Sequence, residues 1–155
     1  KIIIAAHSSG SFVAHHLFKI LFAERILSES NVLADKILYF NLDGGIGSQN
    51  CGVPIDSAVA ENLACIYAVY AYDNDSKIFS PNKEDMVELH KMFENKSTLL
   101  QMDVTGSNST GKWSVHDALI NKKPYNPTSF NLEKDYNNIN SEHPVFDEYL
   151  NEITK

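Results

Sequence analysis

Four apolar runs stand out along the chain, separated by longer amphipathic or polar stretches. The first run, Lys1–Ala6, is apolar at almost every position, which is the pattern of a strand buried on both faces of a parallel sheet. The other runs have the apolar, aromatic and β-branched composition that fits a pleated, half-buried surface. They are Lys36–Leu42, Cys65–Tyr72 and Ser97–Val104. The pattern therefore predicts four strands.

The stretches between these runs have the spacing of helices. Apolar residues recur at helical intervals from Ser11 to about Leu27, which predicts an amphipathic helix. Asp56–Leu63 is a short helix candidate, and Pro81–Asn95 begins with a proline and acidic residues, which suit the N-terminal end of a helix. Strands that alternate with helices predict an α/β fold with a mostly parallel sheet, and we expect right-handed crossovers to place helices on both of its faces.

The length of the chain sets the expected domain organisation. A chain of 155 residues can bury a sizeable core, and we expect residues 1–155 to form a single domain. From Lys122 onward the composition changes to prolines and many asparagines. We expect residues 122–155 to wrap the surface as a tail, with a terminal helix around Val145–Ile153.

Composition and charge exclude several classes of function. The chain has 20 acidic and 13 basic residues, a net charge of −7, whereas binding to a phosphate backbone depends on clusters of Lys and Arg. We therefore expect no nucleic-acid partner. No run reaches the roughly 18 apolar residues of a membrane span. The two cysteines, Cys51 and Cys65, lack a zinc-ligand spacing, and a single disulfide between them is left open.

The pentapeptide Ala-His-Ser-Ser-Gly at residues 6–10 joins the first predicted strand to the first predicted helix. A serine hydroxyl is a weak nucleophile that needs exposure and a neighbouring base. A sharp strand-to-helix turn supplies the exposure, and small residues at its two ends let the backbone turn tightly. The helix N-terminus adds a positive field where an oxyanion would form. Ser8 is therefore a candidate nucleophile and the N–H of Ser9 a candidate oxyanion donor, although Ser8 could also be an ordinary turn or N-cap serine.

This turn and its setting resemble the nucleophile elbow of the α/β-hydrolase superfamily, with Ala6 in place of the usual first glycine. The resemblance covers roughly Lys1–Ile120 and is closest to lipases and esterases. It implies that the strand before Ser8 corresponds to the family's fifth strand and the later runs to its sixth, seventh and eighth. The family's second oxyanion donor would then lie before Lys1, so we expect an upstream half of the same protein and regard residues 1–155 as the C-terminal part of a larger hydrolase-like domain.

The resemblance also implies a general base after the last of these strands, because the family presents its triad in the order Ser, acid, His. His116 follows that strand, in a predicted loop that leads to a helix. Its role would be to take the proton of Ser8 and pass it to the leaving group. Taken alone, His116 could also be a surface-loop histidine. Trp113 could cover the site, contact a substrate or pack in the core.

Three aspartates compete for the acidic position of the triad. Asp73 and Asp75 follow the third predicted strand, where the family usually carries its acid. Asp43 follows the second, where some lipase-like members carry it, and it could equally be a simple turn residue before two glycines. All three follow carboxyl ends of strands, where open α/β sheets bind ligands. We favour the pair Asp73 and Asp75, with Asp43 as the alternative.

The sequence thus predicts a serine hydrolase that cleaves a small-molecule or lipid-like acyl substrate, such as an ester, through an acyl-enzyme. Neither a metal nor an organic cofactor is required for that chemistry. The alternative is a non-catalytic domain of the same fold that serves in binding or as a scaffold and keeps the elbow for structural reasons.

Overall fold

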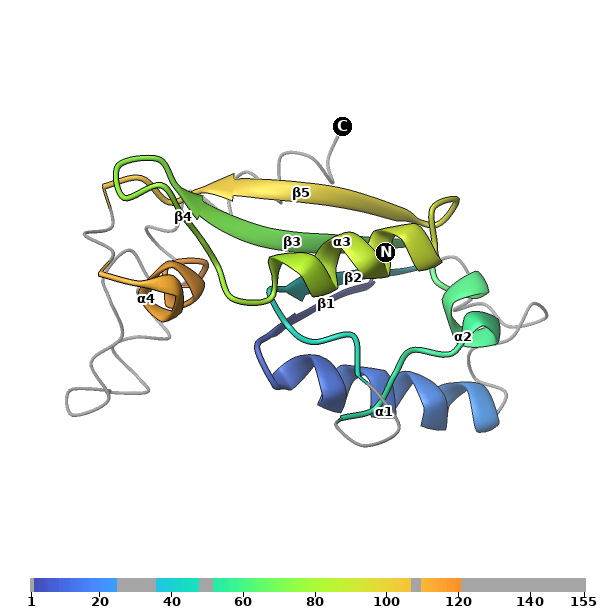
Figure 1. The fold of residues 1–155 in the computed structure, drawn as a ribbon. Helices are drawn as coiled ribbons and strands as arrows, with labels where there is room; N and C mark the ends of the chain where they lie inside the picture. The colour runs from blue at the N-terminus through green and yellow to red at the C-terminus, as the bar shows by residue number, and fades with distance from the viewer. Residues whose placement is uncertain (1, 25–35, 48–51, 107–109, 121–155) are drawn as a thin grey trace. The chain divides into compact units, whose positions relative to one another are not determined.

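The computed structural model describes residues 2–24, 36–47, 52–106 and 110–120 (Figure 1). These residues fall into two compact units, each described by itself below. The first unit consists of Lys1–Tyr70 with Pro81–Gln101, and the second of Ala71–Ser80 with the described part of Met102–Lys155. The predicted surface tail and its terminal helix lie outside the described residues.

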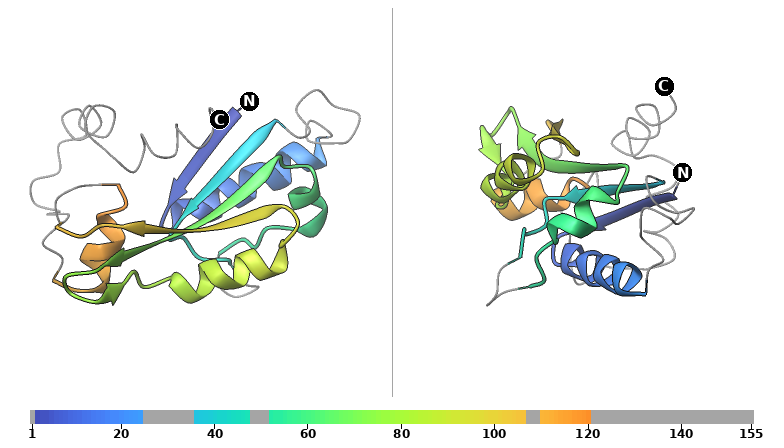
Figure 2. Two further views of the ribbon diagram at one scale, coloured as in Figure 1. Left: turned by 90° about the horizontal axis from the view of Figure 1, so that it is seen from above. Right: turned by 90° about the vertical axis from the view of Figure 1, so that its right-hand side faces the viewer.

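A sheet of five strands forms the framework (Figures 1 and 2). Parallel pairing joins β1 to β2 and β2 to β3, and β5 pairs with the other side of β3. The N–H of Ile66 donates to Lys96 at the start of β5 and that of Val104 to Tyr72 near its end, so β5 also runs parallel to β3. The bounds are Ile2–His7 for β1, Ile37–Leu42 for β2, Cys65–Asp73 for β3, Ile78–Phe79 for β4 and Ser97–Asp103 for β5. All four predicted strands are therefore present within a residue or two of their expected positions.

The short strand β4 was not predicted and makes the sheet mixed. It pairs antiparallel with the last two residues of β3, through Tyr72↔Phe79 and Asp73↔Ile78. The rings of Tyr72 and Phe79 pack with their centroids 4.5 Å apart. A strand of two residues has no alternating pattern of its own, so tertiary pairing alone specifies it.

The helices begin where local capping and charge favour them. The Asp56 carboxylate accepts the Ala58 N–H at 2.8 Å and caps α2, and α3 has Glu84 and Asp85 in its first turn, where negative charge suits the helix dipole. The three helices predicted between the strands are confirmed, each shorter than expected at its C-terminal end. The bounds are Gly10–Ala23 for α1, Ser57–Glu61 for α2, Lys83–Met92 for α3 and Lys112–Asp117 for α4.

The helices of the first unit pack on one face of the sheet. Phe18 of α1 and Met86 of α3 join the same core cluster as Tyr39 of β2 and Ile66 of β3, with α2 contributing Val59. The expectation of helices on both faces is therefore wrong for the described helices of this unit. The helices share one face because of the strand order. The chain advances in one direction, from β1 through β2 and β3 to β5, and right-handed crossovers in one direction place every helix on the same side of the sheet.

Strand β1 lies at the end of the strand order, and within the described residues it pairs only with β2. Its first residues, Ile2 and Ile3, are exposed, as are Val13 and Ile20 of α1.

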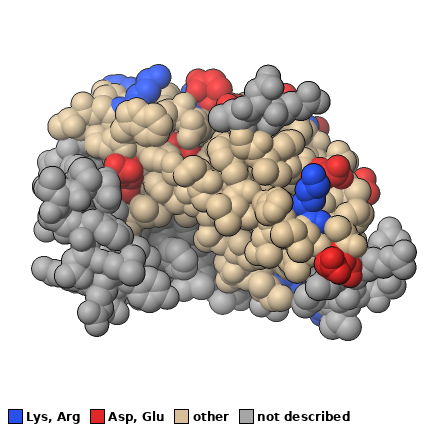
Figure 3. Space-filling view, turned by 90° about the horizontal axis from the view of Figure 1, so that it is seen from below, with Lys and Arg blue, Asp and Glu red and all other residues tan. Residues whose placement is uncertain are grey.

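Lys and Arg side chains form no patch on the described residues of the face drawn in Figure 3, which agrees with the acidic composition. A helix needs about 20 mostly apolar residues to cross a bilayer, and within the described part of the chain no helix meets that requirement. Cys65 carries a free thiol, and Cys51 lies outside the described residues.

Candidate functional site

Ser8 occupies the turn between β1 and α1 with a backbone φ of +56°. Its N–H donates to Leu42 O on the neighbouring strand at 3.2 Å, and its carbonyl accepts the Ser11 N–H of the helix at 3.1 Å. A residue other than glycine pays roughly 1–2 kcal/mol for left-handed backbone because Cβ crowds the carbonyl oxygen. The turn is therefore both tied to its surroundings at each end and strained at the serine.

Ser9 follows the strained serine and directly precedes α1. It has φ −61° and ψ −15°, serves as N-cap of α1 without a side-chain cap hydrogen bond, and is exposed. The first N–H groups of a helix lack intrahelical acceptors and carry the positive end of its dipole. Gly10 differs from the sequence-based expectation, since a Cβ there would meet no atom within 4 Å and the packing does not demand a glycine.

Asp43 ends β2 beside the serine turn and is held on several sides. It has φ +46°, it is fully buried, and its N–H donates to Val69 O at 2.7 Å while its carbonyl accepts from Asn82 Nδ2 at 2.7 Å. The following N–H, of Gly44, donates to the Asn41 carboxamide oxygen at 2.9 Å. Strained left-handed backbone persists only where the surroundings impose it. The hydrogen bonds to Val69, Asn82 and Asn41 impose it at Asp43, so this residue does not belong to a flexible turn.

A buried histidine lies behind the serine turn, on the inner face of α1. His15 Nδ1 is 2.6 Å from Val53 O, and its Nε2 is 2.9 Å from the Tyr39 hydroxyl. The carbonyl can only accept, so Nδ1 carries the hydrogen and Nε2 accepts the Tyr39 hydroxyl proton. Burial lowers the pKa of His15, against a smaller opposing effect of the Val53 hydrogen bond, and burial raises the pKa of Tyr39. The neutral ring thus ties α1 to β2 and to the segment before α2.

His116 lies within α4 of the second unit rather than in a loop, and it is 2% exposed. The helix starts early because the Ser114 hydroxyl accepts the Gly111 N–H at 3.0 Å and donates to the Gly111 carbonyl at 2.8 Å. Val115 and Leu119 are buried and anchor the helix in its unit. The indole of Trp113 stands almost perpendicular to the His116 imidazole, with ring centroids 5.3 Å apart.

The two aspartates after β3 differ sharply in environment. Asp73 is 2% exposed, and its Oδ1 accepts the N–H groups of Asp75 at 2.9 Å and Ser76 at 3.4 Å. Asp75 is exposed. The carboxylate of Asp73 is therefore fixed by the tight turn between β3 and β4, whereas that of Asp75 extends from the turn into solvent.

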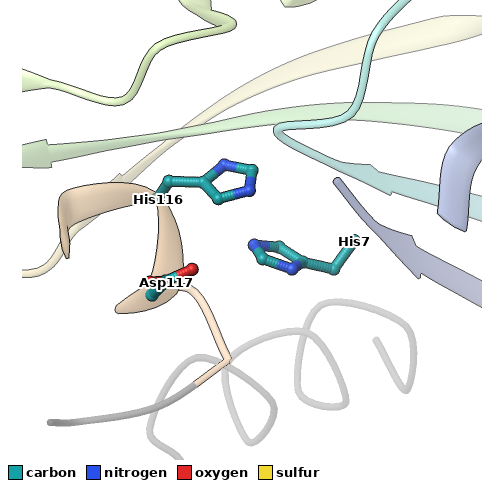
Figure 4. Close-up of side chains that lie close together, drawn as sticks. All are labelled: His7, His116 and Asp117. Atoms are coloured by element: carbon teal, nitrogen blue, oxygen red, sulfur yellow. The ribbon is translucent and has the colours of Figure 1, made fainter. Parts of the chain in front are cut away.

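Figure 4 shows His7 at the end of β1, and His116 and Asp117 on α4. Burial raises the pKa of Asp117, and the neighbouring His116 opposes that change. Within each unit taken by itself, the described residues gather no group of three His, Cys, Asp or Glu side chains with the spacing of a metal site.

The structure brings Ser8 and Asp43 to the carboxyl ends of adjacent strands in the first unit, and it places Asp73 and His116 in the second. No protein-family model, curated protein or solved structure matches the chain. A function must therefore be inferred from the residues of this chain and their arrangement.

Sequence reasoning missed the two asparagines that hold the turn at Asp43, Asn41 and Asn82. His15 has the spacing of a structural residue on the helix after Ser8, but the three segments that it joins were not predicted. The signal for Asn41 in the sequence was a polar residue at an otherwise apolar position inside β2. Such a residue is buried only with a partner, and the partner is set by the tertiary structure.

Proposed function

We propose that this chain carries the nucleophile, base and acid of a serine hydrolase of the α/β-hydrolase type, acting on esters or related acyl substrates. The observation that supports it most is the left-handed backbone of Ser8 at the turn from a parallel strand into a helix. A strained serine at a strand-to-helix turn is the feature that exposes the hydroxyl in a nucleophile elbow. An N-cap serine would instead have extended backbone and a side-chain hydrogen bond to the helix.

In the proposed reaction the Ser8 Oγ attacks the carbonyl carbon while His116 accepts the hydroxyl proton. The Ser9 N–H, at the positive end of α1, donates to the oxyanion. Collapse of the tetrahedral intermediate breaks the bond to the leaving group, which takes the proton from His116. Water then attacks the acyl-enzyme with His116 again as base, and Ser8 regains its proton when the acid product leaves.

Asp73 is our first candidate for the acid that orients His116. It is buried, its Oδ1 accepts two backbone N–H groups, and it belongs to the same unit as His116. Exposure of Asp75 argues against it, since a carboxylate in water supports an imidazolium only weakly. Asp43 is the second candidate because of its full burial and imposed backbone.

Strand β1 pairs only with β2 within the described residues, and this supports the proposed upstream half. Ile2 and Ser8 direct their N–H groups to β2, so the alternate residues Ile3 and Ala5 direct theirs to the opposite edge. Neither of these two is a charged residue or proline of the kind that usually protects a sheet edge. We propose that a further strand of the same protein pairs there and brings the second oxyanion donor.

Labelling of the intact protein with a fluorophosphonate, with mass spectrometry to locate the adduct, tests the proposal. We expect an adduct on Ser8 that is lost in Ser8→Ala and in His116→Ala. Ser9→Ala is the matched control, because it removes the adjacent hydroxyl but keeps the N–H, and it should still be labelled. Absence of an adduct on the folded intact protein would refute the hydrolase and favour a non-catalytic binding or scaffold domain.

A further inference from the structure

Trp113 is a large apolar side chain that the protein leaves in solvent. It is 65% exposed, whereas Val115, Ala118 and Leu119 of the same segment are nearly or fully buried. These three already anchor α4, so Trp113 is not needed for that purpose. Of the three roles left open for Trp113, packing in the core is therefore wrong. The two that remain are covering the proposed base and contacting a substrate.

The position of the indole relative to His116 distinguishes these roles. Trp113 precedes His116 by three residues, so the two side chains are neighbours on the helix surface. Their rings meet edge to face, at 5.3 Å and 86°. That contact occupies only part of the indole, because most of its surface remains exposed. An aromatic surface is thus available next to the proposed base.

The chemistry of the base decides which part of a substrate meets this surface. His116 in the proposed mechanism gives its proton to the leaving group, so the leaving-group atom must lie within hydrogen-bond reach of the imidazole. Groups attached to that atom then extend past the imidazole. The acyl portion stays on Ser8 and lies on the other side of the bond that breaks.

We infer that Trp113 is a specificity residue that binds the leaving-group side of the substrate, and that the favoured substrates carry a flat or apolar alcohol, such as an aryl alcohol. This inference rests on the proposed function. An aryl ring can stack on the indole or meet it edge to face, and both arrangements are favourable beyond the area they bury. A small polar leaving group would gain little from Trp113.

The test uses the intact protein and two phosphonates that differ only in the leaving group, phenolate in one and fluoride in the other. Both transfer the same phosphonyl group to Ser8 Oγ with loss of the leaving group, so only the leaving-group contact differs. Trp113→Ala should slow labelling of Ser8 by the phenolate reagent about tenfold and leave labelling by the fluoride reagent within about twofold, as expected for the loss of one aromatic contact. Trp113→Phe should stay within about threefold of the parent for both reagents, because it keeps an aromatic face.

Lys112→Ala is the matched control, since Lys112 is the exposed neighbour of Trp113. It should leave both rates unchanged. Equal slowing with both reagents in Trp113→Ala would overturn the inference and make Trp113 a residue that positions His116. Unchanged rates with both would exclude a contact with the leaving group. Failure of both reagents to label Ser8 in the parent protein would instead remove the proposed function and this inference with it, whereas failure of the phenolate reagent alone would overturn only the inference.

Discussion

The indole of Trp113 and the imidazole of His116 meet edge to face, with ring centroids 5.3 Å apart and planes at 86°. Trp113 is also the single tryptophan of the chain. Its fluorescence therefore reports on one place, the immediate surroundings of the proposed base.

This pairing predicts that the emission of Trp113 depends on the imidazole beside it. The fluorescence spectrum of the folded His116→Gln variant should differ in intensity from that of the parent, because the ring that meets the indole edge is lost. The measurement is steady-state fluorescence of both proteins at one pH. Identical spectra would mean that the two rings do not meet in solution.

The backbone of Ser8 predicts an unusual order of stabilities. Because Ser8 has φ +56°, glycine relieves a left-handed strain that alanine keeps. Ser8→Gly should therefore be about 1 kcal/mol more stable to unfolding than Ser8→Ala. Lys19, which is exposed in the interior of α1, is the matched control, and there glycine should be about 0.5–1 kcal/mol less stable than alanine. Urea unfolding measures both pairs, and the same order at both positions would mean that Ser8 is not strained.

The buried ring of His15 predicts a loss of stability in mild acid. Its pKa in the folded state is lowered by burial from the ordinary value of 6.5. The unfolded chain thus binds a proton before the folded one does, and the free energy of unfolding should fall as the pH drops below about 6.5 until the folded-state pKa is reached.

Urea unfolding at several pH values between about 5 and 8 tests this effect. His15→Gln should be less stable than the parent at neutral pH, because it loses a packed ring with two hydrogen bonds, but its stability should change less over that range. Tyr39→Phe removes the hydroxyl that donates to Nε2 and should cost about 1–3 kcal/mol at neutral pH through the unpaired acceptor. A parent and a His15→Gln variant with parallel pH profiles would contradict the role of His15.

The three aspartates after β2 and β3 predict different losses of activity. Loss of the triad acid with its shape preserved lowers turnover by about 10⁴ in the best-studied triad. Asp73→Asn should therefore slow phosphonylation of Ser8 by about 10³–10⁴. Asp75→Asn is the control two residues away, and its exposed side chain should change the rate by about twofold or less. If Asp43→Asn shows the large loss and Asp73→Asn does not, the acid is Asp43.

Local pattern was enough to predict the order of strands and helices. Lys1–Ala6 is apolar at almost every position and α2 has an aspartate at its N-cap, and such signals act between residues that are close in the chain. The serine turn belongs to the same class. A strand, a turn of small residues and an amphipathic helix follow each other without a gap, so the setting of Ser8 was visible in the sequence before its backbone angle was known.

Only the tertiary structure decided which of these side chains are buried and what they meet. Asp73 and Asp75 are two residues apart in one polar stretch, yet one carboxylate is fixed in a buried turn and the other faces water. Trp113 was as plausible in the core as on the surface, and its exposure follows from the apolar residues that anchor α4 in its place. The order of the strands decides which face of the sheet the helices cover. Burial, strand order and ring contacts all arise between residues far apart in the chain, and a pattern of neighbouring residues carries no record of those partners.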